Sequence, residues 1–325
     1  MDYKVRFLVV VVTLVWGFNF VVIRWGVESI DPAMMTALRF FFTSVPLIFF
    51  VKNPTINLAV VAMYGVFFGA GIWGLVNLSI ALGTPSGMSS LLLQSSALLT
   101  VLVAVLFFDE KINNVKKVGI GVAFIGFSMV LLFRSEAVSF TGVVLVLWAS
   151  VFMTICNVII RKYKPSDIVG FIVWSSLFVP VPVIVFSVGQ GFYISGSMSV
   201  DSLLQFPSAK AWVSILFQSY VVTLLGYGIW TWAITKHGLS NVAPFSLLIP
   251  VSGLFFGWLL YDEALSMPSI SDRYSFCWGW LCCFFHRFPY LVIEKIQRGK
   301  CEFILIRRHC CHMGYDMDCH PLAAR

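Results

Sequence analysis

The sequence predicts an all-α integral membrane protein of ten helices, built as two five-helix repeats of opposite orientation, with a tenth helix that is atypical or lost. Three observations favour this fold. Hydrophobic residues make up 59% of the 325 residues and charged residues 11%, against about 25% charged residues in soluble domains. Apolar runs of about 20 residues, the length that crosses a bilayer, recur along the chain. One segment, 91–110, also resembles a second segment, 244–263.

Nine apolar runs are long enough to span a membrane. The first has no Ala-x-Ala-like cleavage site, so we expect it to be a membrane span and not a signal peptide. A tenth candidate at 275–293 contains His286 and Arg287, which a membrane interior disfavours. The alternation over about 10 residues that is typical of transmembrane β-strands is not visible. The nine runs lie at 7–25, 33–51, 58–81, 85–108, 116–133, 139–160, 169–188, 211–235 and 240–261.

The distribution of Lys and Arg predicts that the N-terminus is cytoplasmic, because basic residues concentrate in the short cytoplasmic loops of membrane proteins. With that orientation, ten basic residues before Met267 are cytoplasmic and three lie on the other side. The net charge of +7 therefore reflects topology, and no nucleic-acid partner is expected. The ten are Lys4, Arg6, Lys52, Lys111, Lys116, Lys117, Arg161, Lys162, Lys164 and Lys236, and the three are Arg24, Arg134 and Lys210.

An internal duplication underlies the prediction of two repeats. A shift of 153 residues aligns the two similar segments, and each is an apolar helix closed by an acidic pair, Asp109–Glu110 or Asp262–Glu263. We expect both pairs to be solvated helix ends. A repeat with five spans must enter the membrane in the opposite sense the second time, and inverted repeats are typical of transporters whose site lies between the halves. Chance similarity of two apolar helices is the alternative. The predicted repeats occupy 1–135 and 136–266.

Three motifs resemble the EamA family of the drug/metabolite transporter superfamily. They are "LVWGFNFVVI" (14–23), "GYGIW" (226–230) and "APFSLLIPVSGL" (243–254), and the resemblance extends from residue 1 to about 266. It implies a central cavity between two halves of a multi-pass protein of the bacterial inner membrane. It also implies efflux, by alternating access, of amino-acid-like metabolites such as cysteine and O-acetylserine. Other amino acids, drug-like metabolites, a passive pore and a homodimer stay open.

Arg39 is the only charged residue placed well inside a span of the first 266 residues. It follows Pro32 by seven residues, so it lies about 10 Å below the helix end at 1.5 Å per residue. Polar side chains inside spans are costly and therefore candidates for function. We expect Arg39 to attract a substrate carboxylate or to pair with a carbonyl at the cavity wall. The alternatives are that its stem carries the charge to the interface or that it joins helix ends.

Two asparagines are candidates for contact with a zwitterionic substrate. Asn19 shares a face of the first helix with Trp16, since they are three residues apart. Asn157 occupies the comparable place in the sixth helix, so Asn19 and Asn157 are expected to face each other near the axis that relates the repeats. Hydrogen bonds from asparagine to neighbouring helices are common in membranes and are the alternative.

Seven further residues complete the predicted substrate site. Amide, hydroxyl and indole groups can replace the hydration of a zwitterion, and aromatic faces can bind its ammonium group. A proline lacks a backbone N–H and leaves a carbonyl free one turn earlier, which offers an acceptor. Packing, or a position at the membrane interface, is the alternative for the tryptophans. The seven residues are Trp73, Asn77, Gln94, Ser95, Tyr227, Trp230 and Pro250.

Other features argue for packing and against catalysis. The pairs Gly65/Gly69 and Gly253/Gly257 have the spacing that allows close helix contact. The middle of the predicted spans contains no Asp, Glu or His, so no proton carrier is predicted. One His and one Cys before Met267 are too few for a metal centre, and no cofactor is expected. A membrane-embedded enzyme is therefore the less favoured alternative.

The segment 267–325 differs from the rest in holding seven of the eight cysteines. We interpret it as an out-of-frame tail that replaces the native tenth helix, and a transport-defective copy is one alternative. Shifting the codons of "CWGWLCCFF" (277–285) by one base yields Gly-x-Gly followed by small apolar residues. A zinc site in "HCCHMGYDMDCH" (309–320) is disfavoured because the paired Cys-x2-Cys spacing is lacking. Disulfides are disfavoured because a cytoplasmic tail is kept reduced.

Overall fold

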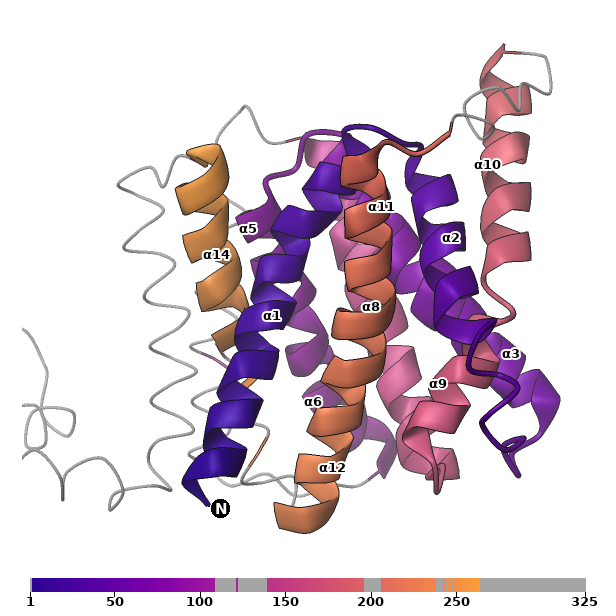
Figure 1. The fold of residues 1–325 in the computed structure, drawn as a ribbon, viewed down its shortest axis with the longest axis vertical. Coiled ribbons are helices and arrows are strands. Elements are labelled where there is room, and N and C mark those ends of the chain that lie inside the picture. The colour runs from indigo at the N-terminus through magenta and orange to yellow at the C-terminus, as the bar shows by residue number, and fades with distance from the viewer. Residues whose placement is uncertain are drawn as a thin grey trace, which may run out of the picture. The chain divides into compact units, whose positions relative to one another are not determined.

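The computed structural model describes residues 2–108, 121, 139–195, 206–237, 242, 245–246 and 248–263, and all regular elements among them are helical (Figure 1). The predicted all-α fold is confirmed for this part of the chain. The elements are α1 (Tyr3–Val27), α2 (Pro32–Ser44), α3 (Leu58–Val66), η1 (Phe67–Gly74), α4 (Leu75–Ala81), α5 (Ser86–Leu93), α6 (Ser95–Phe108), α8 (Phe140–Tyr163), α9 (Ile168–Ser176), α10 (Pro180–Ser195), α11 (Ala209–Leu216), η2 (Phe217–Gly226), α12 (Tyr227–His237) and α14 (Leu248–Tyr261).

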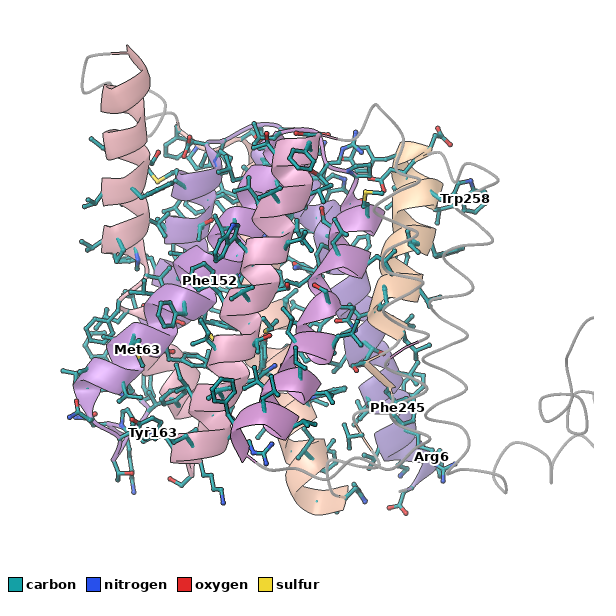
Figure 2. The ribbon with its side chains drawn as sticks, turned by 180° about the vertical axis from the view of Figure 1, so that it is seen from behind. Arg6, Met63, Phe152, Tyr163, Phe245 and Trp258 are labelled. Atoms are coloured by element: carbon teal, nitrogen blue, oxygen red, sulfur yellow. The ribbon has the colours of Figure 1, made fainter. Side chains whose placement is uncertain are left out.

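Six described helical stretches are long and apolar enough to cross a membrane, and α14 is a shorter apolar helix. The six are Tyr3–Val27, Leu58–Ala81, Ser86–Phe107, Phe140–Tyr163, Ile168–Val188 and Ala209–Ile234. The predicted spans at 116–133 and 275–293, and the tail at 267–325, lie outside the described residues, so the count of ten helices stays a prediction. Apolar side chains such as Met63 and Trp258 are exposed and point away from the bundle (Figure 2), as lipid-facing residues do.

The second predicted helix was too long. Helix α2 ends at Ser44, and turns follow up to Phe50, where the apolar pattern predicted helix to residue 51. Val45 still has helical dihedral angles. Pro46 is the physical reason, because it has no backbone N–H and cannot donate the next helical hydrogen bond. The turns keep the chain compact, since the amide of Ile48 donates to the carbonyl of Ser44.

Two predicted spans are interrupted in the middle. The seventh is split into α9 and α10, and α10 begins at Pro180, a residue that favours the first position of a helix. The fourth is split at Gln94, which ends α5 before α6 begins at Ser95. The hydroxyl of Ser95 donates to the carbonyl of Leu92, and this kind of back-bonding competes with regular helix hydrogen bonds.

Two π-helical segments occupy matching places in the two halves. Segment η1 lies between α3 and α4 in the third span, and η2 lies between α11 and α12 in the eighth. A π-helix has one extra residue per hydrogen-bonded turn, and such segments are frequent at functional sites. The correspondence agrees with the internal duplication seen in the sequence.

Contacts at one end of the bundle establish the directions of the helices. Arg24, near the end of α1, binds Glu263, just after α14, which in turn binds Ser86 at the start of α5. Ser79, near the end of α4, donates to Gly142, near the start of α8, over 2.8 Å. Helix α8 therefore runs opposite to α1, and α14 runs opposite to α5. This is the relation expected of inverted repeats.

Small residues let helices of the two halves approach closely. A side chain at Gly17 of α1 would collide with Ser252 of α14, and one at Gly253 of α14 would collide with Ser90 of α5. Close backbone approach through Gly and Ser is a common way to join membrane helices. Gly65 packs in the same way against the backbone of Ser175. The glycine pairs predicted from spacing thus lie in tight helix contacts.

Candidate functional site

Arg39 lies in the interior with none of its surface exposed. Its Nη1 donates to Oε1 of Gln218 over 2.9 Å, and its Nη2 donates to the hydroxyl of Thr223 over 3.1 Å. The guanidinium also lies 4.2 Å from the ring centroid of Trp73, within the range of a cation–π interaction. It therefore does not reach the interface along its stem. We call Arg39, Trp73, Asn77, Gln218 and Thr223 the Arg39 cluster.

The four elements that form this cluster come from both halves of the chain. Helix α2 supplies Arg39 and, one turn earlier, Thr36, whose hydroxyl accepts from Nδ2 of Asn77 over 2.8 Å. Segment η1 supplies Trp73, and the following α4 supplies Asn77. Segment η2 supplies both hydrogen-bond partners of the guanidinium. The two π-helical segments thus meet at Arg39.

Several buried polar atoms around the cluster have hydrogen-bonding capacity that the described residues do not use. Nε of Arg39, Nε1 of Trp73 and Oδ1 of Asn77 have no partner there, and neither do the two side-chain polar atoms of Asn19. A buried polar group without a partner costs about 1–3 kcal/mol. Asn19 precedes Phe20, whose ring lies 6.3 Å from that of Trp73. Such a set of unused donors and acceptors is suited to a polar ligand.

The charge of Arg39 has no counter-charge in the described part of the chain. The ion pairs there involve Arg24, Glu28, Lys210 and Glu263, and none includes Arg39. A buried cation without a carboxylate partner is costly. Among the described residues, the positive charge of Arg39 is therefore uncompensated.

An aromatic group adjoins the cluster. The ring of Trp16 lies 5.1 Å from that of Tyr227 and 5.2 Å from that of Trp230, and its Nε1 donates to the carbonyl of Val222. Phe68 lies between this group and the cluster, since its ring lies 5.7 Å from Tyr227 and 5.8 Å from Phe40. The Phe40 ring centroid in turn lies 5.3 Å from the Arg39 guanidinium. Trp16, Tyr227 and Trp230 thus pack against one another, and a role in substrate binding stays a prediction.

The remaining predicted residues lie elsewhere. Asn157 is exposed and donates to the hydroxyl of Thr100 over 3.1 Å, whereas Asn19 is fully buried. Gln94 and Ser95 form the break between α5 and α6. Pro250 is buried in the first turn of α14, where the amide of any residue would lack a helical partner. Its role as the source of a free carbonyl stays a prediction.

Sequence analysis missed Gln218 and Thr223. Both are polar residues inside the eighth predicted span, so the rule that selected Asn77 applies to them equally. Their pairing with Arg39 joins positions 179 and 184 residues apart. No local pattern signals such a contact.

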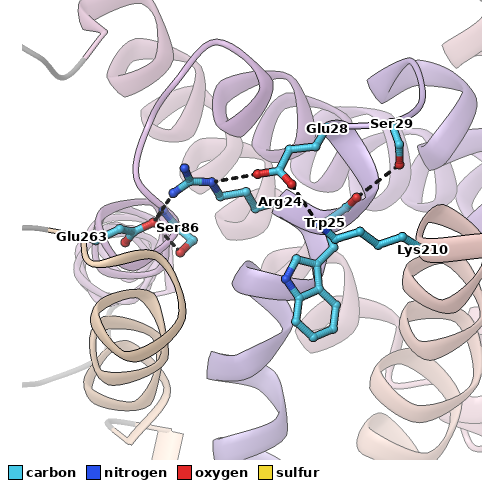
Figure 3. Close-up of polar contacts among 7 residues, drawn as sticks. All are labelled: Arg24, Trp25, Glu28, Ser29, Ser86, Lys210 and Glu263. Carbon is cyan, nitrogen blue, oxygen red and sulfur yellow. Dashed lines mark hydrogen bonds and ion pairs between the residues drawn. The ribbon is translucent and has the colours of Figure 1, made fainter. Parts of the chain in front are cut away.

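A second polar site closes the end of the bundle opposite the N-terminus (Figure 3). Glu263 accepts hydrogen bonds from the amides of Ser86 and Gly87, from the hydroxyl of Ser86 and from Nη1 of Arg24. Its side chain is only 11% exposed. The prediction of a solvated acidic pair was wrong for Glu263, because its carboxylate caps the start of α5, where backbone amides lack helical partners.

The same polar site extends from the end of α1 to the start of α11. Arg24 Nε lies 3.3 Å from Oε1 of Glu28, and Lys210 Nζ lies 3.0 Å from Oε2 of Glu28. Partial burial would raise the pKa of Glu28, but its hydrogen bond and charge interaction with Lys210, together with Arg24 and Tyr261, hold that pKa below 4.5. We call Arg24, Glu28, Ser86, Lys210 and Glu263 the charged clasp.

Comparison with known proteins agrees with the fold. A probable amino-acid metabolite efflux pump of Escherichia coli K12 is 32% identical over 273 residues, which cover 82% of this chain and 90% of that protein. A protein of the same description in Salmonella typhimurium is 31% identical over the same lengths. An uncharacterised transporter of Bacillus subtilis, YoaV, is 25% identical over 85% of this chain and 95% of its own.

A solved crystal structure shares the fold at a TM-score of 0.55 with 16% identity, covering 87% of this chain and 98% of the other. The family model described as the EamA-like transporter family matches residues 4–132 and again residues 140–271. The two matches agree with the duplication seen in the sequence and with the antiparallel relation of α1 and α8. Together they show that this chain belongs to the EamA-like transporter family.

Proposed function

We propose that this protein exports small amino-acid metabolites, such as cysteine and O-acetylserine, across a bacterial inner membrane. The observation that carries the proposal is the charge of Arg39 between the two halves, which no carboxylate among the described residues compensates. The efflux of amino-acid metabolites named for the Escherichia coli relative agrees with it. Membership of a transporter family argues against an enzyme.

The chemistry of the Arg39 cluster fits one end of a zwitterion. A guanidinium binds a carboxylate through two parallel hydrogen bonds, and Arg39 retains an unused Nε. The amides of Asn19 and Asn77 supply both donors and acceptors for polar groups near the carboxylate. The faces of Trp16 and Tyr227 offer a position for the ammonium group through cation–π attraction. Fixed dipoles would replace hydration without holding the solute too tightly to release it.

Alternating access follows from the same arrangement under this proposal. Inverted repeats move as bodies about a site near the midplane, and the charged clasp joins α1 and α5 of one half to α11 and α14 of the other. The clasp would close the outer end if the N-terminus is cytoplasmic. Export would then require the clasp to open after the substrate has reached Arg39.

Export from cells tests the function. Cells that express this chain should release more O-acetylserine and cysteine than cells with the empty vector, and the Arg39→Gln variant should not. Saturation of the flux with rising internal substrate is expected of a transporter and not of a passive pore. A version with a restored tenth helix is measured in parallel, and equal release from both chains, the variant and the vector would show that the substrate class is wrong.

A further inference from the structure

Gln218 is fully buried and its amide orientation is determined by its two neighbours. Arg39 is a donor only, so the atom that faces its Nη1 must be the amide oxygen. On the other side, Nε2 of Gln218 lies 2.9 Å from the hydroxyl of Ser214. That hydroxyl donates its single proton to the carbonyl of Val22 over 2.6 Å, so it must accept from Gln218. Both constraints give the same orientation.

The local helix geometry places the two partners of Arg39 on one side. Gln218 and Thr223 are five residues apart, and residues at that spacing point in different directions in an α-helix. Segment η2 is π-helical, and the hydroxyl of Thr223 donates to the carbonyl of Gln218 over 2.8 Å. One wide turn therefore presents both side chains to the guanidinium. They hold it by Nη1 and Nη2 and leave Nε without a partner in the described residues.

The chemical identity of residue 218 decides what this arrangement attracts. A glutamine and a glutamate have nearly the same shape, but a glutamate at this place would put a carboxylate about 3 Å from Nη1 and neutralise Arg39. The glutamine accepts the same hydrogen bond without supplying a charge. The positive charge is therefore oriented but not compensated by its neighbours.

We propose that Gln218 is a specificity-determining residue that selects solutes with a free carboxylate. It orients the guanidinium of Arg39 and, by being neutral, leaves the charge available to the carboxylate of the solute. The inference rests on the proposed function, and it adds a residue and a selection rule to it. A solute whose carboxylate is replaced by a carboxamide should be accepted poorly.

The decisive measurement is binding by the purified full-length protein in detergent, followed by thermal unfolding. O-acetylserine should raise the unfolding temperature of the wild type at a concentration at least about tenfold lower than its carboxamide does, since a tenfold difference is about 1.4 kcal/mol. In Gln218→Glu that preference should vanish or reverse. An unchanged preference in Gln218→Glu, or no preference for the carboxylate in the wild type, would overturn the inference.

Two further variants separate charge from packing. Gln218→Met keeps the volume and the free charge, so it should weaken binding of both solutes but keep the preference for the carboxylate. Ser214→Ala removes the other partner of the amide while the bond to Arg39 remains, so it should also keep the preference. Loss of the preference in either variant would show that charge is not the cause. These variants also test the inference if Gln218→Glu fails to fold.

Transport measured in parallel distinguishes the inference from the proposed function. Proteoliposomes with the wild-type protein should accumulate labelled O-acetylserine above protein-free liposomes. Selective binding of the carboxylate without any transport would leave the selection rule standing and remove the transport function. Transport with equal rates for carboxylate and carboxamide would remove the selection rule and leave the transport function standing.

Discussion

The two arginines at the interface of the halves differ in how their charge is satisfied. Arg24 lies in the charged clasp with its side chain 33% exposed, and it pairs with the carboxylates of Glu28 and Glu263. Arg39 is fully buried and is held by a neutral amide and a hydroxyl. Burial increases the cost of a charge, so the more costly arginine is the one without a carboxylate among the described residues.

This difference in pairing indicates that one arginine joins helices and that the other is available to a ligand. A salt bridge within the protein joins two elements and needs no ligand, and the clasp does this for α1, α5 and α14. A buried guanidinium with a spare Nε gains most when a ligand supplies the anion. The clasp is thus suited to close one end, and the Arg39 cluster is suited to recognise the solute.

Neutralising Arg39 should give the largest effect. Arg39→Gln removes two charge-assisted hydrogen bonds, each worth about 1.5–3 kcal/mol, along with the group proposed to bind the carboxylate. We expect export of O-acetylserine to fall by at least about a hundredfold, measured as extracellular metabolite per amount of protein in the membrane. Arg39→Lys is the matched control and should recover only part of the flux, because lysine lacks the planar fork. Wild-type flux from Arg39→Gln would contradict the role of the cluster.

Breaking the clasp should have the next largest effect. Glu263→Gln removes a charge that receives four hydrogen bonds, so the end of the bundle opposite the N-terminus should open more often. A cysteine at Ser90, buried between α5 and α14, should then react with an impermeant thiol reagent about tenfold faster, in a background with the eight native cysteines replaced. Arg24→Gln leaves the backbone bonds of Glu263 and should change the rate less.

The side from which this reagent acts also tests the predicted topology. With the N-terminus in the cytoplasm, labelling at residue 90 should require reagent outside the cell. Labelling only from the cytoplasmic side would reverse the assigned orientation.

Substitution of Asn19 should have a smaller effect, in which stability increases and transport decreases. Its buried amide has no partner in the described residues, so Asn19→Leu should remove a desolvation cost and raise stability by about 1–2 kcal/mol. Export should fall severalfold, because the amide is then absent from the site. Unfolding temperature and flux measured on the same preparation check this. A fall in stability would show that Asn19 has a structural partner.

The weakest effect is expected at the exposed end of the clasp. The Lys210–Glu28 pair has side chains 53% and 40% exposed, and surface pairs contribute about 0–1 kcal/mol. Lys210→Ala should therefore change the unfolding temperature little. Because the pKa of Glu28 is lowered in the folded protein, its contribution is present above pH 4.5 and is lost as the pH falls through the folded pKa. Any difference between Lys210→Ala and wild type should disappear under those acidic conditions.

Periodic and compositional features of the fold were predictable, and contacts across the chain were not. Apolar runs predicted the helical stretches at 58–81 and 140–163 to within a few residues. The break at Gln94 was missed because serine back-bonding, and not a proline, interrupts the helix. The end of α2 was misplaced because the apolar pattern continues past Pro46. Hydropathy predicts whether a segment lies in lipid or in water, but it does not predict where the helical hydrogen bonds of that segment are interrupted.

The sequence alone determined that this chain is helical, lies in a bilayer, repeats itself upside down and carries one deeply placed arginine, because composition and spacing act locally. Only the tertiary structure decided which partner each charged side chain contacts. It gave Arg39 a neutral glutamine 179 residues away and gave Arg24 the carboxylate of Glu263 239 residues away. Such pairs depend on the crossing of helices and on the wide turn of η2, and neither leaves a signal in the local pattern of residues.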